Sequence, residues 1–481
     1  MNPYLVLGIV LGYFFVLVGI SWLTSRNADT QAFFTANRKS PWYLVAFGMV
    51  GATLSGVTFI SVPGEVGNSA FSYLQFVFGN IVGYWLVAGI LLPLYYKLNL
   101  VSIYSFLDQR FGPRSYKTGS FFFLISKLIG AAFRLFLVAG VLQIAFFDAF
   151  NIPFYLTVIV TIGLIWVYTF RGGIKTIVWT DTLQTLFLVS AVIFTIVSIA
   201  KSLDLNFGAL LKEISQDQNS QIFFWDWRSG NNFFKQFLAG MFITIVMVGM
   251  DQDMMQKNLT CKNKKEAQKN MLVFSLSFLV TVFLFLGLGV LLYIFAEKNG
   301  IAIPESTDDL YPLLALHHFG LPVGVAFLLG ITAAAYSSAD SALTALTTSF
   351  SVDFLKIERF DEKKRQRIKM GSHLLFSILL IVVILAFKAI NNESIVVAVF
   401  KVAGYTYGPI LGLFIFGMYT KRKVNDKWVP WIGVSAPVIC YFISQYSEIL
   451  FNGYRFGFEL LIVNGLITIL GLLLISKKHA E

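Results

Sequence analysis

The sequence predicts an all-α membrane protein that crosses the bilayer many times. Of its 481 residues, 57% are hydrophobic, only 13% are charged, and 49 are phenylalanine. Soluble globular chains average about 25% charged residues, so this composition is typical of a polytopic helical membrane protein. The net charge of +11 does not indicate a nucleic-acid partner, because the basic residues gather in short segments between apolar runs.

Thirteen segments approach the roughly 20 apolar residues that a membrane helix needs. They are residues 4–24, 41–66, 73–96, 119–148, 154–170, 176–200, 232–255, 270–295, 321–351, 372–390, 395–420, 429–447 and 458–476. The first segment lacks a basic region before it and a small-residue cleavage site, so we expect a retained helix and no signal peptide.

The connections between these segments alternate in charge. Lysine and arginine concentrate at 97–117, 171–175, 257–269, 356–369 and 421–427, whereas 296–320 holds Lys298 alone among four acidic residues. Positively charged loops stay in the cytoplasm. The alternation therefore predicts a multi-pass protein of the inner or plasma membrane, with its N-terminus outside and its C-terminus in the cytoplasm.

The second segment contains "GMVGATLSGVTFISVPGEVG" (48–67), in which five glycines and Pro63 weaken the helix. Hydroxyls of Ser55, Thr58 and Ser61 can bond the backbone groups that a break sets free. Two interpretations stay open here. Broken helices of transporters expose carbonyls that bind Na⁺, and small residues also allow close packing against a neighbouring helix.

The ninth segment carries "GITAAAYSSADSALTALTTSF" (330–350). Ala334, Ser337, Ser338 and Ser341 follow the spacing i, i+3, i+4, i+7 and so share one helix face, with Asp340 beside them. A charge at the bilayer centre costs about 2.5–3.5 kcal/mol, so these oxygens indicate a site for a small hard cation. The alternative is that the hydroxyls bond carbonyls one turn back.

Two further charges lie inside apolar segments. Asp181 follows "RGGIKTIVWT" in the sixth segment and Arg134 lies in the middle of the fourth. Arg134 could hold an anionic substrate through two hydrogen bonds, or it could form an ion pair with Asp181. Lys127 lies nearer the cytoplasmic end, and we expect its ammonium to extend to the membrane surface.

The remaining polar positions do not indicate catalysis. Asp251 and Asp253 lie so near the end of the seventh segment that we expect them to be solvated. Cys261 and Cys440 give no disulfide framework. No phosphate-binding loop, dinucleotide fingerprint or Ser-His-Asp order is present, so the sequence does not support an enzyme or an ATP-driven pump.

Four motifs resemble the sodium:solute symporter family: "RGGIKTIVWTDTLQ" entering the sixth segment, "DQDMMQKNL" at the end of the seventh, "SSADSALT" in the ninth and "GYTYGPILGLFIFG" in the eleventh. The resemblance covers essentially the whole chain. It implies one transporter domain over 1–481 with the leucine-transporter fold. Two inverted five-helix repeats would occupy 41–200 and 232–420, with a helix at 4–24 before them and two helices at 429–476 after them.

The resemblance also implies ion sites. The family's common sodium site would consist of the carbonyls of Gly51, Leu54 and Ala334 and the hydroxyls of Ser337 and Ser338. A second sodium site, present in some members, would involve Asp181, Ser337, Asp340 and Ser341. This chain has Asp340 where such members have a hydroxyl residue, which leaves open whether that position binds a second Na⁺ or a proton.

The resemblance suggests a substrate as well. Arg134, Ser55 and Thr58 are similar to the carboxylate-binding residues of the family's sialic-acid carriers, and Gln75 is a further candidate contact. We therefore expect Na⁺-driven import of a small carboxylate-bearing solute, sialic acid first, by alternating access. The partners expected are this solute, sodium ions and the lipid bilayer, with no nucleic acid and no obligatory protein partner.

Three alternatives stay open at this point. One is a sodium-coupled carrier of sugars or other neutral solutes, and another is a channel or a proton-coupled carrier, of which the proton-coupled carrier would use Asp340. A third is a sensor, because some relatives carry a kinase module behind a transporter-like domain. The short segment "ISKKHAE" after the last span disfavours the sensor.

Overall fold

The computed structural model describes residues 3–25, 36–100, 102–390 and 395–477, and helices dominate it. The one sheet in these ranges is an antiparallel ladder of β1 (Lys423–Val424) and β2 (Ser476–Lys477). Seven helices of the described chain are long and apolar enough to cross a membrane, or up to nine if each bent pair is one span. The all-α membrane fold is confirmed, and the count of thirteen crossings stays a prediction.

Every predicted span falls on helical structure. The helices used below are α1 (Pro3–Ser25), α3 (Trp42–Thr53), α4 (Gly56–Ser69), α5 (Tyr73–Leu86), α6 (Leu92–Lys97), α7 (Ser105–Arg110), α8 (Pro113–Ala145), α9 (Phe154–Ser202), α10 (Phe207–Gln216), α11 (Phe233–Thr244), α12 (Gln252–Asn258), α13 (Lys264–Lys298), α14 (Leu310–His317), α15 (Leu321–Ser349), α16 (Glu362–Ile390), α17 (Ile395–Thr406), α18 (Gly408–Tyr419), α19 (Val429–Gln445), α20 (Ser447–Leu450) and α21 (Leu460–Leu474). The boundary between the fifth and sixth predicted spans differs from expectation: α9 continues through the predicted connection at 171–175.

Three of the predicted spans are interrupted. The second divides into α3 and α4. The seventh divides into α11 and α12, whose two parts are bent by 70°, and the eleventh into α17 and α18, bent by 47°. Interrupted helices expose backbone groups within the bundle, where irregular backbone is tolerated only if protein or a cavity surrounds it. These breaks therefore indicate where ligands can reach the main chain.

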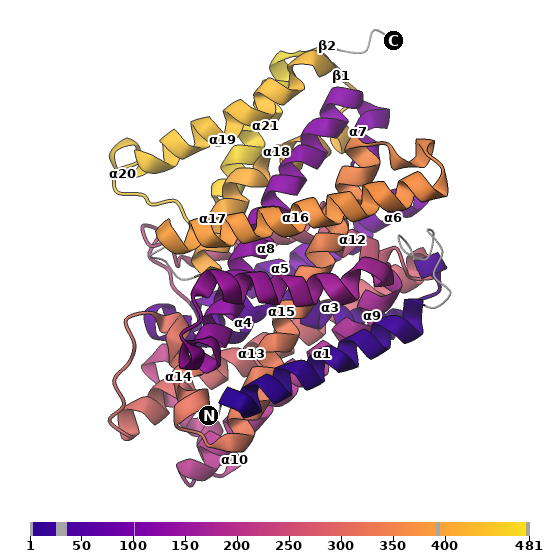
Figure 1. The fold of residues 1–481 in the computed structure, drawn as a ribbon. Helices are drawn as coiled ribbons and strands as arrows, with labels where there is room; N and C mark the ends of the chain where they lie inside the picture. The colour runs from indigo at the N-terminus through magenta and orange to yellow at the C-terminus, as the bar shows by residue number, and fades with distance from the viewer. Residues whose placement is uncertain (1–2, 26–35, 101, 391–394, 478–481) are drawn as a thin grey trace.

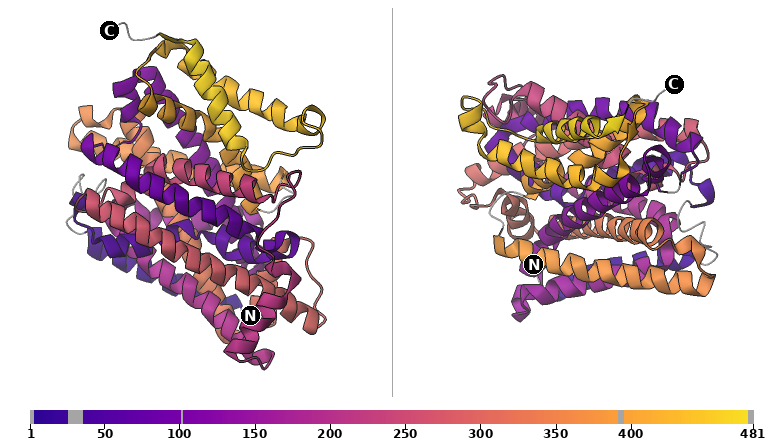
Figure 2. Two further views of the ribbon diagram at one scale, coloured as in Figure 1. Left: turned by 180° about the vertical axis from the view of Figure 1, so that it is seen from behind. Right: turned by 90° about the horizontal axis from the view of Figure 1, so that it is seen from above.

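The helix α15 forms the centre of the bundle. It packs against α9, α8, α16 and α1, while α3 packs on α9, α13 on α4 and α11 on α5. In the apolar stretch of α15 71% of the residues are buried, against 28% for α1, which lies along the outside of the bundle in Figure 1. The views of Figure 2 show the C-terminal helices α19 and α21 on the opposite side from α1.

Candidate functional site

The break in the second span lies at Leu54 and Ser55, between α3 and α4. Leu54 has φ −76° and ψ 68°, and Ser55 has the extended values −68° and 175°, so neither continues the helix. The last carbonyls of a helix have no partner within it. The final turn of α3, which includes Gly51, therefore offers carbonyl oxygens at this point.

The glycines of this segment also pack closely. A Cβ added to Gly51 would lie 2.1 Å from Oγ1 of Thr185 and 3.2 Å from the carbonyl oxygen of Asp181. Thr185 in turn donates a hydrogen bond to that carbonyl, at 2.7 Å. The close packing of small residues is thus present, and the helix is also broken. Whether the exposed carbonyls bind Na⁺ stays a prediction.

The polar face of α15 is buried. None of Ala334, Ser337, Ser338 and Ser341 is more than 6% exposed. The hydroxyl of Ser337 donates to Oδ1 of Asp181 at 2.5 Å. Within the described chain, the buried hydroxyls of Ser338 and Ser341 have no hydrogen-bond partner. Leaving a buried polar group unpaired costs about 1–3 kcal/mol, so both hydroxyls suit a ligand such as a cation.

A cavity joins this face to the predicted substrate residues. About 1040 Å³ of space, part of it open to solvent, lies among Ser55 and Thr58 of α4, Arg134 of α8, and Ser338 and Ser341 of α15. The structure therefore brings three of the four predicted substrate residues to one space beside two of the α15 hydroxyls.

Gln75 is the predicted substrate residue that does not line this cavity. Its side chain is fully buried. Nε2 donates to the carbonyl of Asn231 at 2.9 Å, and Oε1 accepts from the amide of Phe224 at 3.1 Å. These bonds tie α5 to the segment that leads into α11.

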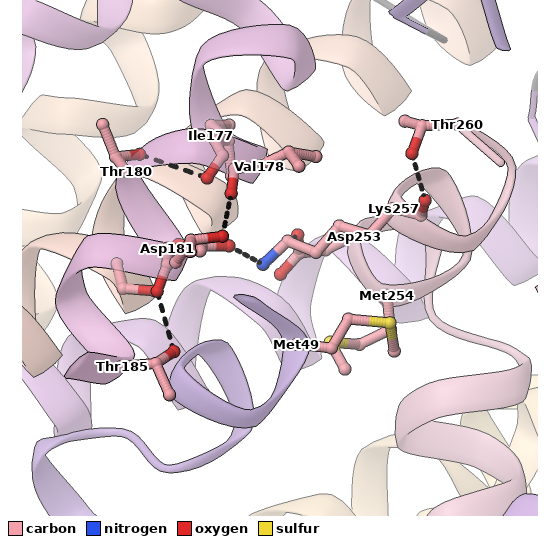
Figure 3. A network of polar contacts seen from close by, with 12 residues as sticks. Met49, Ile177, Val178, Thr180, Asp181, Thr185, Asp253, Met254, Lys257 and Thr260 are labelled. Atoms are coloured by element: carbon pink, nitrogen blue, oxygen red, sulfur yellow. Dashed lines mark hydrogen bonds and ion pairs between the residues drawn. The ribbon is translucent and has the colours of Figure 1, made fainter. Parts of the chain in front are cut away.

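Asp181 forms its ion pair with Lys257. Nζ of Lys257 lies 2.9 Å from Oδ2 of Asp181, and both side chains are at most 2% exposed. Figure 3 shows Lys257 extending from α12 toward Asp181 on α9. The predicted alternative, an ion pair between Arg134 and Asp181, is not formed in the described chain. Lys257, the first residue of the basic connection predicted at 257–269, instead lies on α12 and is buried in the bundle.

Three expectations for the neighbouring charges were wrong. Asp251 and Asp253, expected in solvent, are 1% and 6% exposed. Lys127, expected at the membrane surface, lies 2.8 Å from Oδ2 of Asp253 and 3.3 Å from Oδ1 of Asp251. The physical reason is the 70° bend of the seventh span, which turns both acids toward α8 instead of the cytoplasm.

Asp251 is the N-cap of α12 as well. Its Oδ1 accepts from the amides of Asp253 and Met254, and its Oδ2 accepts from the hydroxyl of Tyr407 at 2.9 Å. An N-cap carboxylate satisfies amides that the helix leaves unpaired. The carboxylate therefore stabilises the new helix direction after the bend and connects α12 to Tyr407, just before α18.

A signal for this network is present in the sequence. Asp253 and Lys257 are four residues apart, which places them on one helix face. Lys127 and Arg134 are seven apart and so share a face of α8. Since buried charges must be paired, two cations on one apolar helix call for acidic partners elsewhere. Which acids these are depends on the bend.

The arrangement combines two chemistries in one space. Hydroxyl and carbonyl oxygens near the break and on α15 suit a small hard cation. The guanidinium of Arg134, accompanied by the hydroxyls of Ser55 and Thr58, suits a carboxylate that also carries hydroxyl groups. A cavity with both groups of residues can bind a cation and an organic anion side by side.

Comparisons with known proteins agree with this arrangement. The model of the Sodium:solute symporter family matches residues 33–427. The chain is 27% identical over 419 residues to the sodium/sialic acid symporter NanT of Aliivibrio fischeri, covering 84% of this chain and 80% of the relative. It is 24% identical over 476 residues to the sodium/sialic acid symporter SiaT of Proteus mirabilis, covering 93% and 91%.

Solved structures show the same fold. One describes the substrate-bound outward-open state of a Na⁺-coupled sialic acid symporter and aligns with a TM-score of 0.82 at 18% identity, over 98% of both chains. Another, the nucleobase-cation-symport-1 family transporter MHP1 in a closed conformation, aligns with a TM-score of 0.55 at 14% identity, over 93% and 96%. Both have the leucine-transporter fold.

Proposed function

Since this chain belongs to the sodium:solute symporter family, whose members are transporters and not enzymes, we propose that its cargo is a small carboxylate-bearing solute, sialic acid first. The observation that carries the proposal is Arg134, which lines the same cavity as Ser55 and Thr58. A guanidinium binds a carboxylate with two parallel hydrogen bonds. The similarity to sodium/sialic acid symporters of two bacteria supports the same choice.

The driving ion would bind between α3 and α15. Its ligands in this proposal are the carbonyl oxygens of Gly51, Leu54 and Ala334 and the hydroxyl oxygens of Ser337 and Ser338. Its support is the break after α3 together with the unpaired, buried hydroxyl of Ser338. Ser337 donates its single proton to Asp181, so its oxygen lone pairs remain for a cation.

Coupling then follows from geometry. Sodium at this position would join the broken second span to α15 and complete the wall of the cavity, so that sodium and substrate favour the same conformation. Such coupling is reciprocal, because each ligand raises the affinity for the other by the same factor. The inward sodium gradient would then drive uptake, and release follows when the cavity opens to the cytoplasm.

The proposal includes the membrane arrangement. The N-terminus would lie outside and the C-terminus in the cytoplasm, with inverted repeats over 41–200 and 232–420. The bends support the repeats, because α3–α4 and α11–α12 are each the first helix of a proposed repeat and both are interrupted. Interrupted helices at corresponding positions of two repeats mark the binding site of many transporters.

The test is uptake of labelled sialic acid into proteoliposomes with an inward gradient of Na⁺, then K⁺, then H⁺. We expect uptake with Na⁺ alone, lost in Arg134→Ala and strongly reduced in Ser338→Ala. Arg359→Ala and Ser435→Ala, which change exposed residues, are the matched controls. Uptake driven by H⁺ alone would reject the sodium assignment and favour the fully buried Asp340 as a proton carrier. Sodium binding without sialic acid uptake would reject the substrate.

A further inference from the structure

The inference concerns the carboxylate of Asp181 and the cation that neutralises it. Asp181 is enclosed by protein, with Ser337 at 2.5 Å from Oδ1 and the ammonium of Lys257 at 2.9 Å from Oδ2. Because a carboxylate inside a bilayer requires a positive partner, some cation has to accompany Asp181 throughout the transport cycle. In this chain a side chain already supplies it.

Lys257 is assigned to Asp181 by distance. Its other acidic neighbour, Asp253, is 3.9 Å away, and that carboxylate lies only 2.8 Å from Lys127. The ammonium of Lys257 is also within electrostatic range of Asp340. Together with Asp251 beside Lys127, two cations and four acids thus form a network in which each lysine has its own closest carboxylate.

A second cation at Asp181 would meet strong repulsion. Sodium bound to an oxygen of Asp181 would lie within a few ångströms of the Lys257 ammonium, and the surroundings are almost fully buried. Like charges repel far more strongly in such surroundings than in water. The acidic group that could hold a second sodium therefore already contains its cation.

We propose that the Lys257 ammonium is the permanent cation of the Asp181 site, so that this carrier binds one sodium ion per cycle and no second one. The inference rests on the proposed sodium-coupled function and adds its stoichiometry. One Na⁺ together with one monovalent carboxylate moves no net charge, whereas two Na⁺ with the same anion move one positive charge inward. Lys257 is thus the residue that sets the ion count.

Sodium titrations test the proposal in two independent ways. The first measures the initial rate of sialic acid uptake against Na⁺ concentration in proteoliposomes, with choline replacing Na⁺. The second measures the melting temperature of the purified protein against the same Na⁺ series without substrate. For the uptake rate we expect a Hill coefficient near one. For the melting temperature we expect a dependence on Na⁺ concentration that corresponds to a single bound ion. A Hill coefficient near two, or a two-ion slope, overturns the proposal.

The membrane potential gives a third measurement. We expect the same initial uptake at zero potential and at an inside-negative potential set with K⁺ and valinomycin. Uptake stimulated by the negative potential, with one charge moved per sialic acid, overturns the single-sodium cycle while leaving the symport function intact. Absence of any Na⁺ effect on both uptake and melting temperature rejects the proposed function itself, so the two failures are distinguishable.

Variants of Lys257 show whether its charge is responsible. Lys257→Met removes the cation, and we expect its sodium titration to become steeper, toward a Hill coefficient of two, as Na⁺ enters beside Asp181. Lys257→Arg keeps the charge and should stay near one. If Lys257→Met does not fold, the double variant Asp181→Asn/Lys257→Met, which removes both charges, should still give a one-ion titration. A two-ion titration in Lys257→Arg or in the double variant contradicts the proposal.

Discussion

Nζ of Lys257 on α12 lies 2.9 Å from Oδ2 of Asp181 on α9, although the two residues are 76 positions apart in the sequence (181 to 257). This contact ties the bent seventh span to α9, which also packs along α15 and α3. It therefore connects the acids beside the proposed substrate cavity to the helices that would hold sodium.

Removing one partner of this pair should destabilise the protein strongly. Either Asp181→Asn or Lys257→Met leaves a buried charge without its partner, which typically costs about 3–5 kcal/mol. The double variant should lose clearly less than the sum of the two, because no isolated charge remains. Melting temperatures and denaturant unfolding of all four proteins in one detergent give the double-mutant cycle. Strict additivity would show that the contact contributes nothing.

Replacing Arg134 by lysine should weaken substrate binding but leave sodium binding unchanged. Lysine keeps the charge and loses the planar pair of donors that matches a carboxylate. We expect KM for sialic acid to rise about tenfold, which corresponds to about 1.4 kcal/mol, with the same sodium dependence of the melting temperature. Arg359→Lys, on the surface, is the control. An unchanged KM would place the carboxylate elsewhere in the cavity.

Adding one methyl group at Gly51 should disturb the break of the second span. The Cβ of Gly51→Ala would meet Oγ1 of Thr185 at 2.1 Å, and overpacking of this kind costs about 1–3 kcal/mol. We expect a lower melting temperature and a weaker effect of Na⁺ on it. Gly163→Ala is matched, since a Cβ there meets nothing within 4 Å, and it should keep or slightly raise stability. Equal behaviour of both variants would refute the close contact.

Cys261 should resist alkylation over a wide pH range. It is fully buried after α12, and its burial raises the pKa of the thiol to about 12. The thiolate is the reactive form, so its fraction stays very small until the pH approaches that value. In a Cys440→Ala background, we expect maleimide labelling to be much slower at pH 7–9 than for an ordinary thiol of pKa about 8.5. Rapid labelling only after denaturation is the expected control result.

Much of the fold could be predicted because each signal is local. Apolar length and the composition of the spans gave the all-α membrane fold, and the glycines around Leu54 located the break between α3 and α4. The spacing of Ser337, Ser338 and Ser341 placed their hydroxyls on one buried face. Helix periodicity and the bilayer are enough for such inferences, since neither depends on distant parts of the chain.

Only the tertiary structure shows which buried charges are partners. The sequence by itself determined that Arg134 and Asp181 lie within apolar spans and need partners, but it could not say which partners. It did not predict that Lys127 is buried. The 70° bend at the end of α11 brings Asp253 to Lys127 and Lys257 to Asp181. Because a charge buried in low dielectric takes the partner that the packing brings nearest, only the packing of α8, α9 and α12 decided these pairs.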